Sequence, residues 1–278
     1  MFKNVLVGVD GRPTGRDAIA LATRLLDADG KLTLAHVHND VLSPLHAAAP
    51  GVIEQERKAS HELLERERAT AEVSADLISV AAFSPGGGLH EQAEQMHADL
   101  LVVGSSSRGA FGRIMLGDDT RAALNGAPCA VAIAERGYAE HPRPLAKIGV
   151  AYNDSPESVA ALAKAHQVAQ PTRASVHVLQ VVPISSYAYG GAVPVGAFVQ
   201  EMLDDATKNL AELPDVEARA VSGLPGEELA GFGDQVDLLV VGSRGYGPLK
   251  RLVLGSTTMF LQRHGRSSLL VLPRVATA

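Results

Sequence analysis

An internal duplication constrains the fold of this chain more than any other feature of its sequence. The segment DLLVVGS occurs twice, beginning at Asp99 and again at Asp237. Thirteen residues past the glycine of each copy, a second matching segment ends, at Gly117 and at Gly255. Such constant spacing indicates that a whole unit was duplicated. A long unit present only twice excludes a solenoid, which needs at least three short repeats. The chain is therefore predicted to be a pair of related domains.

The length of the chain fits this prediction. Its 278 residues suit two units of ordinary domain size, each large enough to bury a core without metals or disulfides. We place the first domain at residues 1–138 and the second at residues 145–278. At their boundary, the segment from Arg136 to Pro144 contains two prolines and charges of both signs, which favours an extended connection.

Each unit alternates short apolar runs with helical patterns. Uninterrupted runs of Val, Leu and Ile predict strands buried on both faces, and the helices between them predict right-handed parallel crossovers. The fold class is therefore α/β, with two tandem doubly wound, Rossmann-like domains that each contain a five-stranded parallel sheet. The expected strands are 4–9, 32–37, 77–82, 100–103 and 130–133, then 148–152, 176–182, 216–221, 238–241 and 269–272. The expected helices are 14–27, 55–72, 89–97 and one after Gly117, then 157–169, 198–213, 227–232 and 256–263.

Charge and composition exclude several classes of partner. The net charge of −6 argues against a nucleic acid, whose backbone needs a basic face, although one local phosphate pocket can still be positive. No stretch approaches the roughly 18 consecutive apolar residues that a membrane span requires. The N-terminal apolar run is broken by Gly8 and Asp10 and lacks a cleavage-site pattern. We therefore expect a cytoplasmic protein. Cys129, the single cysteine, is expected to be a small buried hydrophobe.

Two loops of the second unit are expected to meet at the carboxyl ends of the strands, where open α/β sheets bind ligands. One loop follows the first strand at Tyr152 and Asn153, and the other runs from Gly242 to Ser256. Its glycines let backbone N–H groups approach a phosphate. Ser256 is predicted to cap the last helix, whose dipole and free N–H groups would face the same point. The pattern predicts a phosphate-binding loop; the alternative is a strand-to-helix turn without a ligand.

The spacing of this loop, G-x-x-G, nine residues, then G-S, is similar to the phosphate loop of ATP-binding universal stress proteins. Together with its two repeats, the chain resembles the tandem members of that family, which implies an adenine nucleotide alpha hydrolase-like fold and bound ATP. The resemblance implies contacts to the nucleoside from Ala151, Tyr152, Asn153 and Val181, and contacts to the phosphates from Gly242, Ser243, Gly245, Gly247, Gly255, Ser256 and Thr257, with positive charge from Arg244 and Arg251. The family usually has Asp where this chain has Asn153, and this departure weakens the case for a Mg²⁺ ion.

The first unit shows the opposite pattern of losses. It keeps Asp10, but Ser107 replaces the second glycine of the phosphate loop and Asp118 replaces the capping serine. A carboxylate within about 4 Å of a phosphate would cost on the order of 1 to 4 kcal/mol. The first unit is therefore predicted to bind nucleotide weakly, in another pose, or not at all. Its corresponding contacts would be Gly8, Val9, Asp10, Val37, Gly104, Ser105, Arg108, Gly109 and Gly117.

Other chemistry has little support in the sequence. His36 and His38 lie two apart on a strand and His46 could join them, but no further metal-ligand spacing accompanies them, so we expect surface or pocket-rim histidines and no metal site. The sequence contains no Walker motif, no paired carboxylates and no Ser/His/Asp spacing of known meaning. No general base can be named for ATP hydrolysis. We predict that the protein is no enzyme, or at most a very slow ATPase.

These observations favour a cytoplasmic, ATP-binding regulatory protein of the stress response, with nucleotide held mainly in the second unit. The alternative is an interaction module that keeps the fold without the nucleotide; a third reading is an enzyme related by fold, whose motif we do not find. The final strands of the two units are expected to face one another about a pseudo-twofold axis, because apolar edge strands otherwise invite association. The sequence does not decide whether the protein also forms a homodimer, nor which protein partner or stress signal it has. The segment 183–199 is either a lid or a mobile loop.

Overall fold

The computed structural model describes residues 1–39, 50–105, 123, 125–183, 195–243, 252 and 255–274, and in them strands and helices alternate as the apolar runs predict. The strands of the first unit are β1 (Phe2–Gly8), β2 (Leu26–Asn39), β3 (Asp76–Ala82), β4 (Leu100–Gly104) and β5 (Ala130–Ala134), with helices α1 (Pro13–Leu25), α3 (Pro50–Ala71) and α4 (Pro85–Gln95). The strands of the second unit are β6 (Lys147–Tyr152), β7 (Ser175–Pro183), β8 (Glu217–Gly223), β9 (Leu238–Gly242) and β10 (Ser268–Leu272), with helices α6 (Pro156–Thr172), α7 (Val195–Leu210), α8 (Pro225–Gly233) and α9 (Ser256–His264). The expected helix after Gly117 and most of segment 183–199 lie outside these residues.

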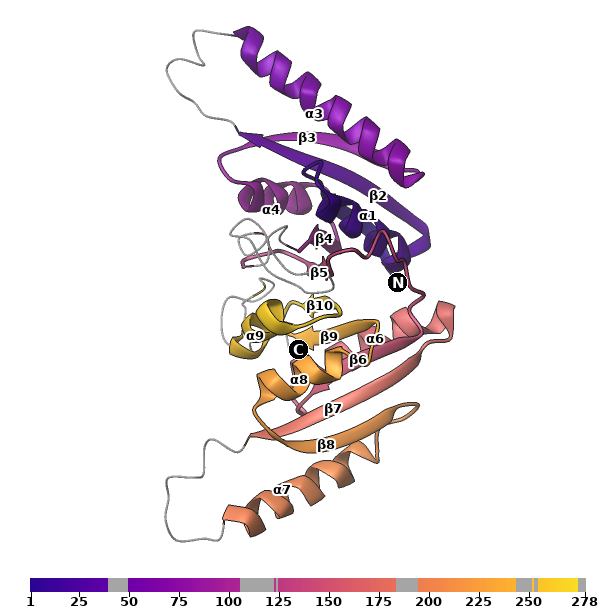
Figure 1. The fold of residues 1–278 in the computed structure, drawn as a ribbon, viewed down its shortest axis with the longest axis vertical. Coiled ribbons are helices and arrows are strands. Elements are labelled where there is room, and N and C mark those ends of the chain that lie inside the picture. The colour runs from indigo at the N-terminus through magenta and orange to yellow at the C-terminus, as the bar shows by residue number, and fades with distance from the viewer. Residues whose placement is uncertain are drawn as a thin grey trace.

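The ten strands form one continuous sheet in the order β3-β2-β1-β4-β5-β10-β9-β6-β7-β8 (Figure 1). Within each unit the five strands are parallel. The two sheets join where β5 and β10 pair antiparallel, with Leu270 opposite Ala132. Both strands are buried along their whole length. The predicted pairing of the final strands is therefore confirmed, and it covers the two apolar edges that would otherwise be exposed.

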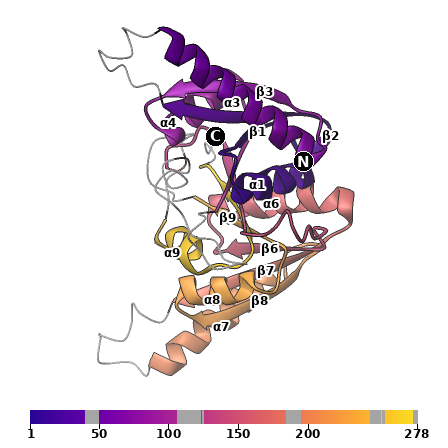
Figure 2. The same ribbon diagram turned by 45° about the horizontal axis from the view of Figure 1, so that its top comes forward.

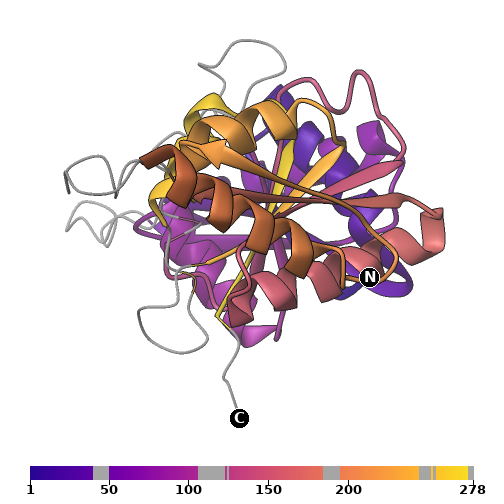
Figure 3. The same cartoon turned by 90° about the horizontal axis from the view of Figure 1, so that it is seen from below.

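Helices cover both faces of this sheet (Figures 2 and 3). On one face, α1 and α6 pack against the central strands, and α3 and α7 extend that layer outward. On the other face, α4, α8 and α9 pack, with α8 against α9. Each face has its own cluster of buried apolar side chains. Strands buried on both sides are therefore the reason that their sequences are continuously apolar rather than alternating.

The aspartates that open the two DLLVVGS repeats hold the sheet together. Asp99 accepts backbone hydrogen bonds from Lys3, at 2.8 Å, and Asn4, at 2.9 Å, at the start of β1. Asp237 does the same for Ala146, at 2.9 Å, and Lys147, at 2.8 Å, at the start of β6. Each carboxylate thus fixes the fourth strand of its unit beside the first. The repeated aspartate is structural.

The first part of the connection between the units is turned rather than extended, so the prediction of an extended connection was wrong there. Residues 136–140 form consecutive turns, and Tyr138 is buried in the main core. The buried carboxylate of Asp17 on α1 accepts hydrogen bonds from the backbone N–H groups of Gly137, at 2.9 Å, and Ala139, at 2.8 Å. Burial raises the pKa of Asp17 above its ordinary value. The connection is turned because a side chain far away in the sequence supplies its hydrogen-bond acceptors.

Cys129 is buried and free, as predicted. Its burial raises the pKa of the thiol to about 12, so the thiol stays protonated at neutral pH and is a poor nucleophile. Across the described part of the chain, none of the helices has the length and apolar character needed to cross a membrane.

Candidate functional site

The turn after β6 lies at the carboxyl edge of the sheet, together with the described ends of the predicted phosphate loop, Gly242 and Ser243 at one end and Gly255 and Ser256 at the other. The strand β6 pairs in parallel with both β7 and β9, so the chain leaves this edge in different directions after β6 and after β9. This is the topological switch point, where open α/β sheets bind ligands. The same arrangement recurs in the first unit, where β1 lies between β2 and β4.

The glycines that end the fourth strands bring these loops together. A Cβ atom on Gly242 would lie 2.8 Å from Cβ of Glu157 and 3.0 Å from its backbone carbonyl, in the first turn of α6. A Cβ atom on Gly104 would lie only 2.0 Å from the backbone oxygen of Thr14, in the first turn of α1. Any larger residue would separate the strand end from the helix start. Packing therefore requires glycine at both predicted phosphate positions, whether or not a phosphate binds.

The turn after β6 is held by its own side chains. Asn153 Oδ1 accepts hydrogen bonds from the Ser155 hydroxyl, at 2.7 Å, and backbone N–H, at 3.4 Å. The Tyr152 hydroxyl donates to Asp154 Oδ1 at 3.1 Å; burial and this carboxylate raise the pKa of Tyr152. Since the Asn153 oxygen is already engaged, its NH₂ group is the part suited to donating to a ribose hydroxyl.

The matching turn of the first unit has the same shape and a different charge. Gly11, at φ +72°, occupies the left-handed position that Asp154, at φ +61°, occupies in the second unit. Asp10 Oδ1 accepts the backbone N–H of Arg12 at 3.1 Å, and the Arg12 guanidinium lies 3.7 Å from its other oxygen. Both side chains are more than half exposed, so this ion pair is weak. Asp10 thus keeps the carboxylate that Asn153 lacks.

Two buried hydroxyl groups stand at the carboxyl ends of the fourth strands. Ser105 and Ser243 donate their backbone N–H groups to Ala134 and Leu272, at 3.1 and 2.9 Å. Their Oγ atoms are buried, and neither has a hydrogen-bond partner among the residues that the structure describes. A buried hydroxyl without a partner costs free energy. Each is therefore placed to be satisfied by a polar group of a ligand.

The last helix begins at Ser256, as the predicted range has it, but its cap lies one residue earlier than the sequence suggested. Its N-cap is Gly255, in an extended conformation, and no side chain caps it; Ser256 is the first helical residue, so its predicted capping role was wrong. Glycine can hold this backbone but supplies no side-chain acceptor for the N–H groups of the first turn. Because α9 leads into a parallel strand, its N-terminus lies at the same carboxyl edge. An uncapped helix start at this edge suits an anion.

The predicted base contacts lie on one face of the sheet. Ala151 and Val181 are partly buried against the apolar cluster of the α8 face, and Val37 has the corresponding place in the first unit. Sequence reasoning overlooked Gln180, whose Oε1 is buried without a described hydrogen-bond partner and whose backbone pairs with Tyr152. The signal was present: Gln180 is the one polar residue in the segment VLQVV at 178–182 of β7.

His36 and His38 are partly buried and take part in side-chain contacts. His36 Nδ1 lies 2.9 Å from the Ser60 hydroxyl, and burial lowers the pKa of His36. His38 lies 3.9 Å from Glu56. Within the described ranges, no group of three or more His, Cys, Asp or Glu side chains could hold a metal ion. His46 lies outside those ranges.

Much of both phosphate loops lies outside the described residues. This applies to Gly245 and Gly247, with the cations Arg244 and Arg251, and in the first unit to Arg108, Gly109 and Gly117. The described residue Leu252 shows where the second loop leads. Its N–H donates to Ala127 at 3.0 Å and its carbonyl accepts from Gly126 at 2.9 Å. The second unit's loop is thus attached to the first unit.

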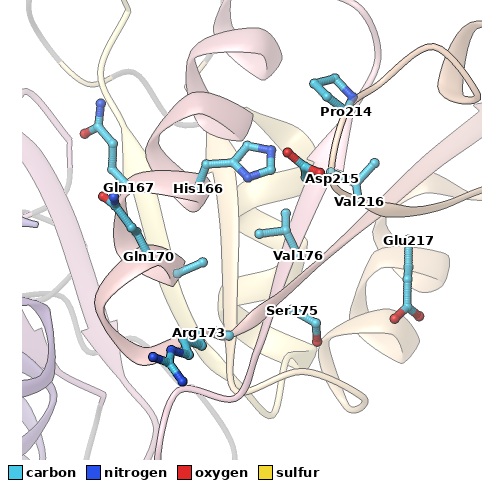
Figure 4. Close-up of a pocket in the computed structure, with 12 residues that line it drawn as sticks. His166, Gln167, Gln170, Arg173, Ser175, Val176, Pro214, Asp215, Val216 and Glu217 are labelled. Atoms are coloured by element: carbon cyan, nitrogen blue, oxygen red, sulfur yellow. The ribbon is translucent and has the colours of Figure 1, made fainter.

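A cavity of about 780 Å³ lies at the opposite, amino edge of the sheet (Figure 4). Gln170 and Arg173 approach it from the end of α6, and Asp215 and Val216 from the segment before β8. Among the described residues, this cavity is lined by the end of α6 and not by a helix start, so it does not suit a polyphosphate. Strand topology and the helix starts favour the carboxyl edge instead.

Comparisons with known proteins agree with this architecture. A model of the universal stress protein family matches residues 1–135 and 145–273. A universal stress protein of Mycobacterium tuberculosis is 24% identical over 202 residues, which cover 68% of this chain and 69% of that protein. One from Thermus aquaticus is 29% identical over 136 residues, 47% of this chain and 97% of that protein. The crystal structure of a universal stress protein from Archaeoglobus fulgidus has a TM-score of 0.70 at 18% identity and covers 98% of each chain.

Proposed function

Because the chain belongs to the universal stress protein family, we propose that it is an ATP-binding regulatory protein of the cytoplasmic stress response. The nucleotide would be held mainly by the second unit, at the carboxyl ends of β6 and β9. Occupancy of this site would favour one conformation or assembly of the protein, and so carry a signal rather than drive a reaction.

The unpartnered hydroxyl of Ser243 is the observation that supports this proposal most directly. It is buried at the switch point, beside a glycine that allows the two loops to touch. The uncapped start of α9 lies at the same edge of the sheet. A phosphate would accept from both kinds of donor, and the helix dipole would favour its negative charge. ATP would thus satisfy polar groups that the protein itself leaves unsatisfied.

We propose that residue 153 does not bind a metal ion, because it is an asparagine and has no carboxylate. An amide stands at the position of the family's usual Asp, and its oxygen already accepts from Ser155. Any Mg²⁺ that accompanies ATP would then be held through the phosphates. We expect ATP affinity to change little when Mg²⁺ is chelated.

We also propose that ATP turnover is too slow to be the purpose of the site. Phosphoryl transfer to water needs a group that positions the attacking water. In the turn after β6, Asn153 supplies an amide and not a carboxylate, and Asp154 Oδ1 already accepts from the Tyr152 hydroxyl, so we name no general base there. Steady turnover at about 1 per second or faster, within the common range of enzymes, would contradict this.

Calorimetric titration of the full chain with ATP, comparing Ser243→Ala with its matched control Ser105→Ala, tests the proposal. Removing an unsatisfied hydroxyl should not destabilise the free protein. If Ser243 donates to a phosphate, its loss should remove about 1.5 to 3 kcal/mol, which weakens ATP binding about 10-fold to 140-fold. Ser105→Ala should leave the affinity unchanged. Equal effects of the two variants would contradict the assignment to the second unit.

Mass spectrometry of small molecules released from the purified protein separates this proposal from the alternative, an interaction module without nucleotide. The proposal predicts an adenine nucleotide, retained or readily loaded, with at most one tight site per chain. Absence of binding by ATP, ADP, AMP and cyclic AMP in the titration would favour the interaction module.

A further inference from the structure

A second cluster of reactive side chains lies at the amino edge of the second unit, far from the carboxyl edge. Ser175 and His177 are two residues apart on β7 and therefore share a face of the sheet. The Ser175 Oγ atom lies 2.8 Å from His177 Nε2. On the other side of the ring, His177 Nδ1 lies 3.4 Å from Glu217 Oε2 on β8. A hydroxyl, an imidazole and a carboxylate thus follow one another in the order of a serine hydrolase triad.

We propose that Ser175, His177 and Glu217 form an acyl-transfer site that attacks small carboxylic esters. Such triads are recognised by geometry and roles rather than by sequence position. Ser175 would be the nucleophile and His177 its general base. Glu217 would be a positioning residue that holds the imidazole and stabilises its protonated form.

The register of the sheet places a cation beside the nucleophile. Lys147 on β6 is the cross-strand partner of Ser175, and Gly149 is the partner of His177, which in turn pairs with Glu217. Lys147 and Ser175 thus occupy one row of the sheet, and Gly149, His177 and Glu217 occupy the next row on the same face. The Lys147 ammonium is therefore the group available to stabilise the oxyanion that forms when the serine attacks. Both Ser175 and Glu217 appear among the side chains of this edge in Figure 4.

Whereas Ser175 lines the cavity of about 780 Å³, a neighbouring pocket of about 410 Å³ lies beside His177 and Glu217, which line it. Phe232 and Val236 of the α8 region give it an apolar wall, and Lys147 and Arg219 give it positive charge. This lining suits an ester with a short acyl chain and an anionic group, which the cations would attract. A Cβ atom on Gly149 would lie 2.9 Å from the Phe232 ring, so glycine is needed for the wall to stand where it does.

The proposed reaction has two balanced steps. Ser175 Oγ bonds to the ester carbonyl carbon while its proton moves to His177 Nε2. The carbon–oxygen bond to the leaving alcohol then breaks, and the imidazolium returns the proton to that oxygen. Water, deprotonated by the same imidazole, attacks the acyl-serine and releases the acid, which restores the hydroxyl. No oxidant, metal or further co-reactant is needed.

The reaction should be slow, for two structural reasons. Glu217 is 74% exposed, so water competes with its carboxylate for the imidazole. Lys147 is exposed, and a solvated ammonium replaces the backbone donors of a preorganised oxyanion hole, where losing one donor costs about 10²-fold to 10³-fold. The Ser175 hydroxyl also has a second acceptor, the carbonyl of Ala146 at 3.3 Å. We therefore expect an acylation burst followed by turnover well below about 1 per second.

The first unit provides an internal comparison. At the equivalent positions of its sheet, Lys31 replaces the serine, Thr33 the histidine and Asp76 the glutamate, since Lys31 pairs with Asn4 and Thr33 with Asp76. This row has neither nucleophile–base pair nor imidazole. The cluster is thus a property of the second unit and not of the fold.

Stopped-flow release of 4-nitrophenol from 4-nitrophenyl acetate, with mass spectrometry of the quenched protein, tests the proposal on the full chain. We expect a burst of about one equivalent per chain and an acetyl group on Ser175. Ser175→Ala should abolish both. Ser74→Ala, in the corresponding amino-edge groove of the first unit, is the matched control and should change neither. An unaltered burst in Ser175→Ala, or acetyl groups only on lysines, would overturn the proposal.

Variants of the other two residues separate chemistry from folding. His177→Gln should reduce the burst rate at least 10²-fold while circular dichroism and thermal stability stay close to those of the wild type. Glu217→Gln should lower the rate constant of the acylation burst several-fold with little change in the KM for the ester, because the imidazole loses the carboxylate that orients it, and Glu217→Asp should restore the rate in part. Equal burst rates in the wild type and Glu217→Gln would refute the positioning role. We expect the anionic ester 4-nitrophenyl succinate to react faster than 4-nitrophenyl acetate. Loss of this preference in Arg219→Gln would identify Arg219 as the cation that attracts the anionic group.

Discussion

The charge at the start of α9 gives the sharpest test of the nucleotide site. Ser256 is the first helical residue, is exposed, and follows a cap that provides no side-chain acceptor. The substitution Ser256→Asp gives the second unit the carboxylate that the first unit carries at Asp118. An acidic residue in the first turn of a helix is favourable by about 0.3 to 1 kcal/mol, so the free protein should become slightly more stable.

The same carboxylate should weaken ATP binding. At about 4 Å from a phosphate, the repulsion between unit charges is about 1 kcal/mol in water and about 4 kcal/mol near a protein surface. The dissociation constant should therefore rise between about 5-fold and about 700-fold. The change is opposite in sign to the effect on the free protein, which separates local charge repulsion from general damage to the fold.

Titration calorimetry with ATP and thermal denaturation without it measure the two effects. Ser256→Asn is the matched control, because it has the shape of aspartate without the charge, and it should bind ATP within a few-fold of the wild type. Added salt should narrow the gap between the two variants, since it screens exposed charges. Equal affinities of the Asp and Asn variants would refute the placement of the phosphates at the start of α9.

Three further predictions concern the scaffold. Gly104→Ala and Gly242→Ala should each lower the free energy of unfolding in urea by about 1 to 3 kcal/mol or more, and Gly104→Ala by more, because its Cβ would lie only 2.0 Å from a backbone oxygen. The control Gly231→Ala, whose Cβ would have no atom within 4 Å, should be neutral or stabilising. An equal loss of stability in all three variants would contradict the packing argument. Because burial raises the pKa of Asp17 in the folded state, its protonation contributes stability below pH 3.8 that is lost as pH rises. In urea unfolding from pH 4 to pH 7, the free energy of unfolding of the wild type should therefore fall relative to that of Asp17→Asn. A difference between the two proteins that does not change with pH would contradict this. Cys129 should react with a thiol reagent only as the chain unfolds, and rapid labelling of the native protein would show that it is accessible.

Local pattern accounts for most of the fold. The duplicated DLLVVGS segment and the apolar runs predicted all ten strands and the pairing of the final two, because strands buried on both faces must be apolar throughout. Strand ends differed by a few residues where pairing with neighbours extends a strand. For example, β2 begins at Leu26, before the predicted 32, because Leu26 pairs with Phe2. No local signal in the sequence records such a partner.

The candidate site was predictable in outline and less so in detail. The spacing of glycines located the loops at the switch point, but it suggested a phosphate role for Gly104 and Gly242, whose contacts to the first helices already require glycine. The cap of α9 lies at Gly255, and the buried Gln180 side chain, whose residue pairs with Tyr152, was not foreseen. These details depend on where a helix begins and which way a side chain faces.

The sequence by itself determined that the chain forms two α/β units, where their strands and helices lie, and at which edge a phosphate loop would stand. Periodicity and repeat spacing are short-range properties, and a single sequence contains them completely. Only the tertiary structure decided which distant groups meet. Asp17 accepts hydrogen bonds from the turn at 136–140, and His177 lies between Ser175 and Glu217. Such contacts follow from strand register and helix packing, which are fixed when the whole core closes and not by any segment alone.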